Sequence, residues 1–198
     1  TNYVDVRENQ IVADIHNALL DLNNTTFNDF DIDIHQSTIN KAITEANKAV
    51  VGSDIEIDLV KRWSPVAGVL STTTFSVDNP LISSTQGEYG AAQTKFAVSS
   101  SVFRVVINNT IENVVIRDNG IGSLFMYIIR DASTSIKVQP AIGTVDYATG
   151  AVQITADIYD YVGPITISCK IASKGINVSL NKFALIDSSY ISLNMVSQ

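Results

Sequence analysis

The spacing of apolar residues changes along the chain and predicts helices first and strands afterwards. Residues Tyr3 to Arg7 alternate apolar and polar side chains, which predicts a short strand. The apolar residues that follow recur at the spacing of one helix face: Ile11, Ile15, Ala18, Leu19 and Leu22. A polar run at 23–26 ends this predicted helix, because Asn and Thr side chains compete for backbone hydrogen bonds.

A second helix is predicted over 38–50, with Ser37 as its N-cap and Gly52 ending it. Its apolar stripe consists of Ile39, Ile43, Ala46 and Val50. Before and after this helix, acidic residues alternate with apolar ones at 29–34 and 54–59, which predicts half-buried strands. Two helices on a small sheet satisfy this pattern most economically, so residues 1–66 are predicted to form an α/β module.

The rest of the chain reads as short β-branched segments separated by turn residues, among them Asp118-Asn119-Gly120. Residues 98–198 are therefore predicted to form an antiparallel, sandwich-like β domain. Residues 67–97 join the two parts, and Leu70–Gln93 is rich in Ser, Thr and Gly, which predicts an extended polar arm or loop. The predicted fold class is α+β, a two-helix α/β module followed by a β-rich domain.

Composition narrows the class of partner. The chain of 198 residues has a net charge of −7, and its 13 Lys and Arg are scattered, which argues against binding to nucleic acid. No apolar run approaches the length of a membrane span, and the first residues lack a signal-peptide pattern, so a cytoplasmic origin is expected. The single cysteine, Cys169, lies in a predicted strand and is expected to be packed and inert.

Two groups of polar residues are candidates for chemistry. Asp29-x-Asp31-x-Asp33 copies the start of a calcium loop, but Ile34 and Asn40 replace the glycine and glutamate that such a loop needs. The histidines, His16 and His35, have no converging partners in the sequence and are expected at the surface or at a cap. Hydrolase and nucleotide-binding motifs are missing. No catalytic residue, metal ligand or cofactor is predicted, and a glycosidase built on paired carboxylates is the enzymatic alternative.

The segment 142–154 is predicted to form a β-hairpin. Val145 and Tyr147 lead into the turn, and Val152 and Ile154 lead out of it. The turn residues Asp146, Tyr147 and Gly150 are assigned a structural role, with Gly150 taking a positive φ that a larger residue adopts only with strain.

The run Gly143-Thr-Val-Asp-Tyr-Ala-Thr-Gly150 resembles a hairpin of the baseplate wedge proteins of contractile-tailed bacteriophages, the group related to baseplate J-like proteins. The order of elements in the first 65 residues, through Lys61-Arg62-Trp63-Ser64-Pro65, is similar as well. The resemblance implies a structural subunit of the virion's tail baseplate, without catalysis or cofactor. It implies contacts with other wedge subunits and with copies of itself, through which the signal for contraction passes. Family members are longer, so the chain is expected to be a C-terminal portion or a shortened relative.

An assembly protein functions through interfaces, and the polar arm is the predicted one, because extended arms gain affinity by ordering against a neighbour. The candidate interface residues are Trp63, Leu81, Ile82 and Tyr89. Trp63 is equally compatible with a core position that joins the two domains. The alternative function is a carbohydrate-binding β-sandwich domain of a tail fibre or adhesin, which requires exposed aromatic rings.

Overall fold

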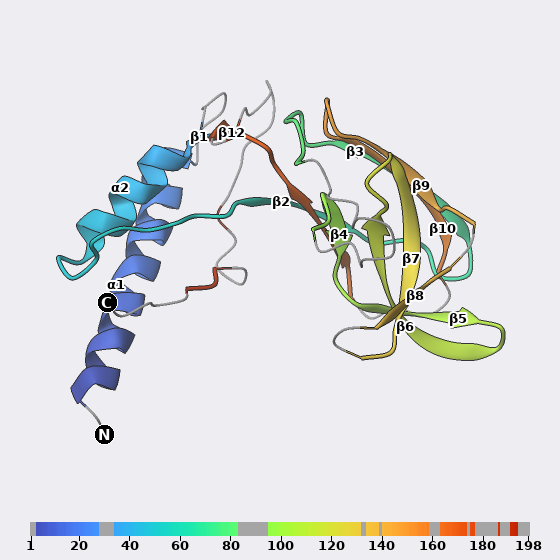
Figure 1. Ribbon diagram of the computed structural model, residues 1–198, viewed down its shortest axis with the longest axis horizontal. Helices are drawn as coiled ribbons and strands as arrows, with labels where there is room; N and C mark the ends of the chain where they lie inside the picture. The colour runs from blue at the N-terminus through green and yellow to red at the C-terminus, as the bar shows by residue number, and fades with distance from the viewer. Residues whose placement is uncertain are drawn as a thin grey trace. The chain divides into compact units, whose positions relative to one another are not determined.

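The computed structural model divides the chain into two compact units (Figure 1). The first unit combines Thr1–Glu56 with Lys174–Gln198, and the second is the continuous stretch Ile57–Ser173. The residues described by the structure are 3–27, 34–82, 95–131, 134–138, 140–158, 163–173, 175–176, 186 and 191–193.

Two helices dominate the first unit. Helix α1 spans Tyr3–Leu22 and continues into a π-helical turn, Asn23–Phe27. Helix α2 spans Gln36–Ala46 and packs against α1. The central residues of both predicted stripes are buried: Ile11, Ile15 and Leu19 of α1 and Ile39 and Ile43 of α2. Val50, which the second predicted stripe also included, lies beyond the end of α2.

The predicted strand at Tyr3–Arg7 is wrong, because these residues belong to α1. A helix propagates one hydrogen bond at a time once it is nucleated, so the long stripe that follows outweighs an alternation of five residues. The predicted break at 23–26 is also wrong. There the helix widens into the π-turn, and the hydroxyl of Thr25 donates to the carbonyl oxygen of Asp21 at 2.8 Å.

The ends of α2 also differ from the prediction. His35 precedes the helix without a side-chain cap, and Ser37 lies inside the helix. The helix ends at Ala46, well before Gly52, where the next residue, Asn47, becomes extended. The amide of Asn47 donates to the carboxylate of Asp14 on α1 at 2.7 Å, which ties the end of α2 to its neighbour.

The first unit also contains a two-stranded antiparallel pair, β1 (Ile34–His35) with β12 (Gly175–Ile176). This pair brings residues from both ends of the chain into one unit. Ile34 and Ile176 face each other across it and are both buried.

The second unit is one strongly curved antiparallel sheet (Figure 1). Its path among the described residues runs in the order β2-β11-β4-β6-β7-β9-β10-β3, with β5 paired to β6 and β8 paired to β7. The strands are β2 (Asp58–Trp63), β3 (Leu70–Ser76), β4 (Val98–Ser100), β5 (Phe103–Ile107), β6 (Thr110–Asp118), β7 (Ser123–Ile129), β8 (Ser135–Lys137), β9 (Gly143–Asp146), β10 (Ala151–Asp157) and β11 (Ile165–Lys170).

The inner face of this sheet forms the core of the second unit. Its largest fully buried apolar side chains come from segments spread along the sequence: Ile116, Leu124, Ile154, Ile158, Ile165 and Ile167. Together, the helices of the first unit and this antiparallel sheet confirm the predicted α+β class with a β-rich domain.

Two predicted segments belong to this sheet instead. The arm prediction is wrong for Leu70–Ser76, which is strand β3 and pairs with β10 over its whole length. The strand predicted around Ile55 begins only at Asp58, and this strand, β2, pairs with β11 rather than with the first module. The boundary between the units accordingly falls at Glu56 rather than at residue 66, and residues 174–198 group with the helices.

The segment Val77–Ile82, which follows β3, spans between distant parts of the sheet through backbone hydrogen bonds. Val77 N–H donates to Gly150 O at 3.1 Å, and Leu81 N–H donates to Tyr147 O at 2.8 Å, both on the β9–β10 hairpin. Ile82 N–H then donates to Lys170 O, at the end of β11, at 3.0 Å. The segment therefore links β11, near the start of the sheet's path, to the hairpin near its far end.

We predict that Gly150→Ala destabilises the second unit more than Gly163→Ala. Both glycines have a positive φ, +71° and +74°. A methyl group at 150 would collide with the backbone of Asn79 and the side chain of Val77, whereas a methyl group at 163 meets nothing within 4 Å. Gly163→Ala should lower the free energy of unfolding by about 1–2 kcal/mol from strain alone. Gly150→Ala should lower it by a further ~1–3 kcal/mol from overpacking.

Urea unfolding followed by tryptophan fluorescence measures both variants, because the single tryptophan, Trp63, is buried in this core. Equal losses for the two variants would contradict the predicted contact between the turn and the segment Val77–Ile82.

Candidate functional site

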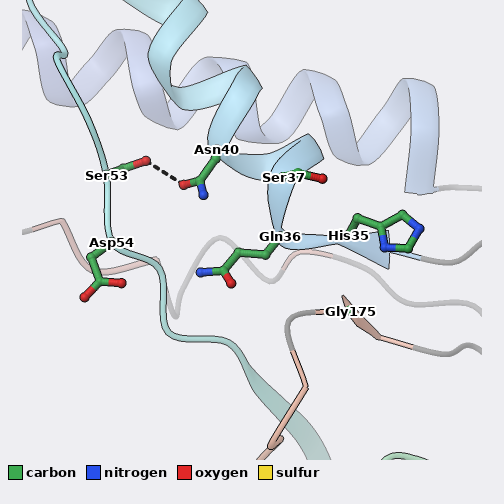
Figure 2. A pocket seen from close by; sticks show the side chains of 7 residues that line it. All are labelled: His35, Gln36, Ser37, Asn40, Ser53, Asp54 and Gly175. Atoms are coloured by element: carbon green, nitrogen blue, oxygen red, sulfur yellow. Dashed lines mark hydrogen bonds between the residues drawn. The ribbon is translucent and has the colours of Figure 1, made fainter.

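A polar pocket of about 540 Å³ lies in the first unit (Figure 2). It is lined by His35, Gln36, Ser37, Asn40, Ser53, Asp54 and Gly175. The start of α2 supplies one side, the extended segment before β2 supplies the other, and Gly175 of β12 contributes backbone.

The polar side chains of the pocket hold the unit together. Ser53 Oγ donates to Asn40 Oδ1 at 2.7 Å, and Gln36 Nε2 donates to the carbonyl oxygen of Ile55 at 2.9 Å. Both bonds fasten the segment 53–55 to α2. This segment is not part of a regular strand, and the two hydrogen bonds attach it to α2.

Ser53 in this pocket lacks the partners of a nucleophilic serine. A serine nucleophile needs a base within hydrogen-bond reach and a third group that orients the base. Ser53 donates to an amide oxygen instead, and in Figure 2 His35 and Asp54 lie on opposite sides of the pocket. The groups present offer hydrogen bonds to a small polar molecule, and nothing in their geometry favours one reaction.

The described residues that could bind a metal ion do not cluster. In the part of the chain that the structure describes, no group of three or more His, Cys, Asp or Glu side chains is placed to hold a metal ion. Asp29, Asp31 and Asp33 lie outside the described residues. His16 is half-buried on α1, and His35 is exposed beside Gly175. Within the described residues, no helix is long and apolar enough to cross a membrane.

Cys169 is packed, as predicted. Its side chain is fully buried in β11, and burial, followed by the negative charges of Asp58 and Asp118, raises the pKa of the thiol to about 12. The reactive form of cysteine is the thiolate, so this group is not a nucleophile at neutral pH.

The predicted interface residues are largely internal. Trp63 ends β2 opposite Ile165, and only 7% of its surface is exposed, so it is a core residue of the second unit rather than an exposed anchor. Leu81 bridges to Ile171 and is 4% exposed, and Ile82 is half-buried against the same core. Their apolar surface is used within the chain, which corrects the interface assignment for Trp63 and Leu81. Tyr89 lies outside the described residues.

The predicted structural turn forms as a tight hairpin. Gly150 has the positive φ, and its N–H donates to Asp146 O at 2.8 Å. Asp146 Oδ1 accepts the N–H of Ala148 at 2.9 Å. Hydrogen bonds from the Thr149 side chain and then from the Ala148 backbone lower the pKa of Asp146. Strands β9 and β10 pair on either side, from Asp146↔Ala151 to Gly143↔Ile154.

Tyr147 connects this hairpin to a buried carboxyl group that the sequence suggested only as a turn residue. Its hydroxyl donates to Asp118 Oδ2 at 2.8 Å and accepts Gly122 N–H at 3.3 Å. Asp118 is fully buried and also accepts Val98 N–H at 3.0 Å and Gly120 N–H at 3.2 Å. One side chain thus holds β4, the β6–β7 turn and the β9–β10 hairpin.

We predict that Tyr147→Phe lowers the free energy of unfolding of the second unit by about 1.5–3 kcal/mol, because the buried Asp118 loses one of its donors. Tyr127→Phe is the matched control, since this half-buried tyrosine makes no hydroxyl hydrogen bond to any described residue. The control should stay within about 0.5 kcal/mol of wild type in urea unfolding. Similar losses for both variants would show that the Asp118 bond contributes little.

We also predict that Cys169 resists alkylation by iodoacetamide in the native protein and reacts after unfolding. Because the folded pKa, about 12, lies above the ordinary value of 9.0, the unfolded chain releases this proton first as the pH rises. The stability contributed by the protonated thiol is therefore present below about pH 9 and is lost between about pH 9 and 12.

Comparing the pH dependence of unfolding for wild type and Cys169→Ala isolates this contribution, and identical slopes above pH 9 would contradict it. Stoichiometric labelling of the folded protein would contradict the burial of the thiol.

No protein-family model matches this chain, and no curated protein matches it.

Proposed function

We propose that the chain is a structural subunit of a phage tail baseplate wedge that acts in baseplate assembly and passes on the contraction signal through protein contacts. The observation that carries this proposal is the hairpin Gly143–Gly150. The residues that resemble the wedge family connect three parts of the second unit. Tyr147 donates to Asp118, and Gly150 contacts the segment after β3.

The division of the chain into two units supports the same proposal. The chain leaves the first unit at Glu56 and returns to it at Lys174, so the second unit is attached through two connections. Two compact units on paired connections give a subunit two separate bodies with which to contact different neighbours. Motion between such bodies is a common way to pass a signal through an assembly.

The exposed apolar residues of the second unit also favour contacts with other proteins. Val106 and Ile111 are cross-strand neighbours on the β5–β6 hairpin, with 43% and 58% of their surfaces exposed. Clustered apolar side chains at the surface mark interaction sites more often than isolated ones do.

The carbohydrate-binding alternative has less support from the visible aromatic rings. The Arg117 guanidinium lies 4.6 Å from the centre of the Phe96 ring, and Lys137 Nζ lies 4.5 Å from the centre of the Phe125 ring. Phe125 is also only 7% exposed. Sugar rings stack on open aromatic faces, whereas these two faces are taken by the chain's own cations.

The proposal predicts that the chain, isolated in its native particle, accompanies sheath and tube proteins in six-fold or twelve-fold copy number. Native mass measurement gives the stoichiometry, and cross-linking mass spectrometry identifies the neighbours. A stable free protein without phage partners would contradict the proposal, and glycan-array binding by that protein would favour the carbohydrate-binding alternative.

A further inference from the structure

The two strands that end the sheet differ in charge. Strand β2 carries Asp58, Lys61 and Arg62, whereas the seven residues of β3, Leu-Ser-Thr-Thr-Thr-Phe-Ser, include no charged residue and no proline. The shorter lateral strands β5 and β8 carry Arg104 and Lys137. Charges and prolines are the usual protection of an edge strand against pairing with another chain. Among the described strands at the sheet's edges, β3 alone lacks this protection.

The register shows which backbone groups of β3 point outward. Thr155 of β10 donates its backbone N–H to Ile142 O, on the side away from β3. The backbone N–H and C=O groups of its neighbours Ile154 and Ala156 therefore point toward β3. The backbone groups of their partners, Thr73 and Ser71, therefore point toward β10. Because alternate residues of a strand point to opposite sides, the N–H and C=O groups of Thr72 and Thr74 lie on the outer edge. No described strand pairs with them there.

The side chains of β3 suit an added strand. Leu70, Thr72 and Thr74 are exposed on one face, and Ser71, Thr73 and Phe75 are half-buried on the other. Threonine is β-branched and favoured in strands, and cross-strand threonine pairs are stabilising. Leu70 is 68% exposed, which leaves apolar surface at the start of the strand for a partner to cover.

We propose that two copies of the chain pair through antiparallel β3 strands, with a two-fold axis at Thr73. In this register Thr72 of one copy lies opposite Thr74 of the other, and the outward backbone groups of both residues are hydrogen-bonded. The same residues then supply both sides of the interface, as a two-fold contact requires. No like charges meet across β3.

The charge distribution favours a second copy as the occupant. The second unit contains 8 Lys and Arg against 9 Asp and Glu, a net charge of −1, whereas the first unit contains 5 against 11, a net charge of −6. Two second units can therefore approach each other without strong repulsion. This pairing does not depend on the baseplate proposal, because it rests on the backbone and composition of β3 rather than on the hairpin.

Sedimentation equilibrium of the whole chain over a wide concentration range tests the pairing. Wild type should show a reversible monomer–dimer equilibrium. The double variant Thr72→Lys with Thr74→Lys places lysines opposite each other twice, and should raise the dissociation constant at least about tenfold. The double variant Thr72→Lys with Thr74→Glu places a lysine opposite a glutamate twice, and should keep the dimer.

This charge pattern separates the proposed register from other possibilities. In a parallel, in-register pair both double variants would weaken the dimer, because each new charge would face the identical residue of the other copy. Val60→Lys on the charged edge β2 is the control and should leave the equilibrium unchanged. Trp63 fluorescence confirms that each variant is folded. A monomeric wild type at the highest concentration, or a Lys/Lys variant that dimerises like wild type, would overturn the proposal.

Discussion

The second unit depends on the buried carboxyl group of Asp118. A polar group without solvent is stable only when its hydrogen bonds are supplied by the protein, and here the donors come from three separate parts of the sheet. These donors include Val98 at the start of β4, Gly120 in the turn after β6, and Tyr147 in the β9–β10 hairpin. Each donor fixes the position of its own segment. The hairpin, in turn, supports the segment that follows β3, through Gly150 and Tyr147.

The fold could be predicted from the sequence where the signal was local. The stripe of Ile11, Ile15 and Leu19 gave a helix, and the Asp146–Gly150 turn gave a hairpin, because both patterns repeat within a few residues. Strand β3 was missed because its threonines and serines lack the apolar alternation that marks a half-buried strand, and only pairing with β10 makes it regular. The partner of β2 is hard to predict for a related reason, since the strand it pairs with, β11, lies more than a hundred residues further along the sequence.

The candidate site was harder to predict than the fold. An aromatic or aliphatic residue such as Trp63 or Leu81 has the same letter in a core and at an interface, and burial distinguishes the two. The Asp118–Tyr147 bond joins residues that the sequence placed in two independent turns, and only the arrangement of the sheet brings them together. The open edge of β3 is likewise a property of the sheet order. The sequence shows directly that β3 carries no charge, but not that the strand lies at an edge of the sheet.

The pairing of Ile34 with Ile176 determines the order in which the two units can finish folding during synthesis. The helices of the first unit leave the ribosome before any strand of the second unit, yet β1 has no partner until Gly175 and Ile176 have been synthesised. The second unit is continuous in sequence, and the last of its described strands, β11, ends at Lys170. The nascent chain can therefore complete the described strands of the sheet before β12 is available to pair with β1. Final folding of the first unit is thus coupled to the end of translation of this segment.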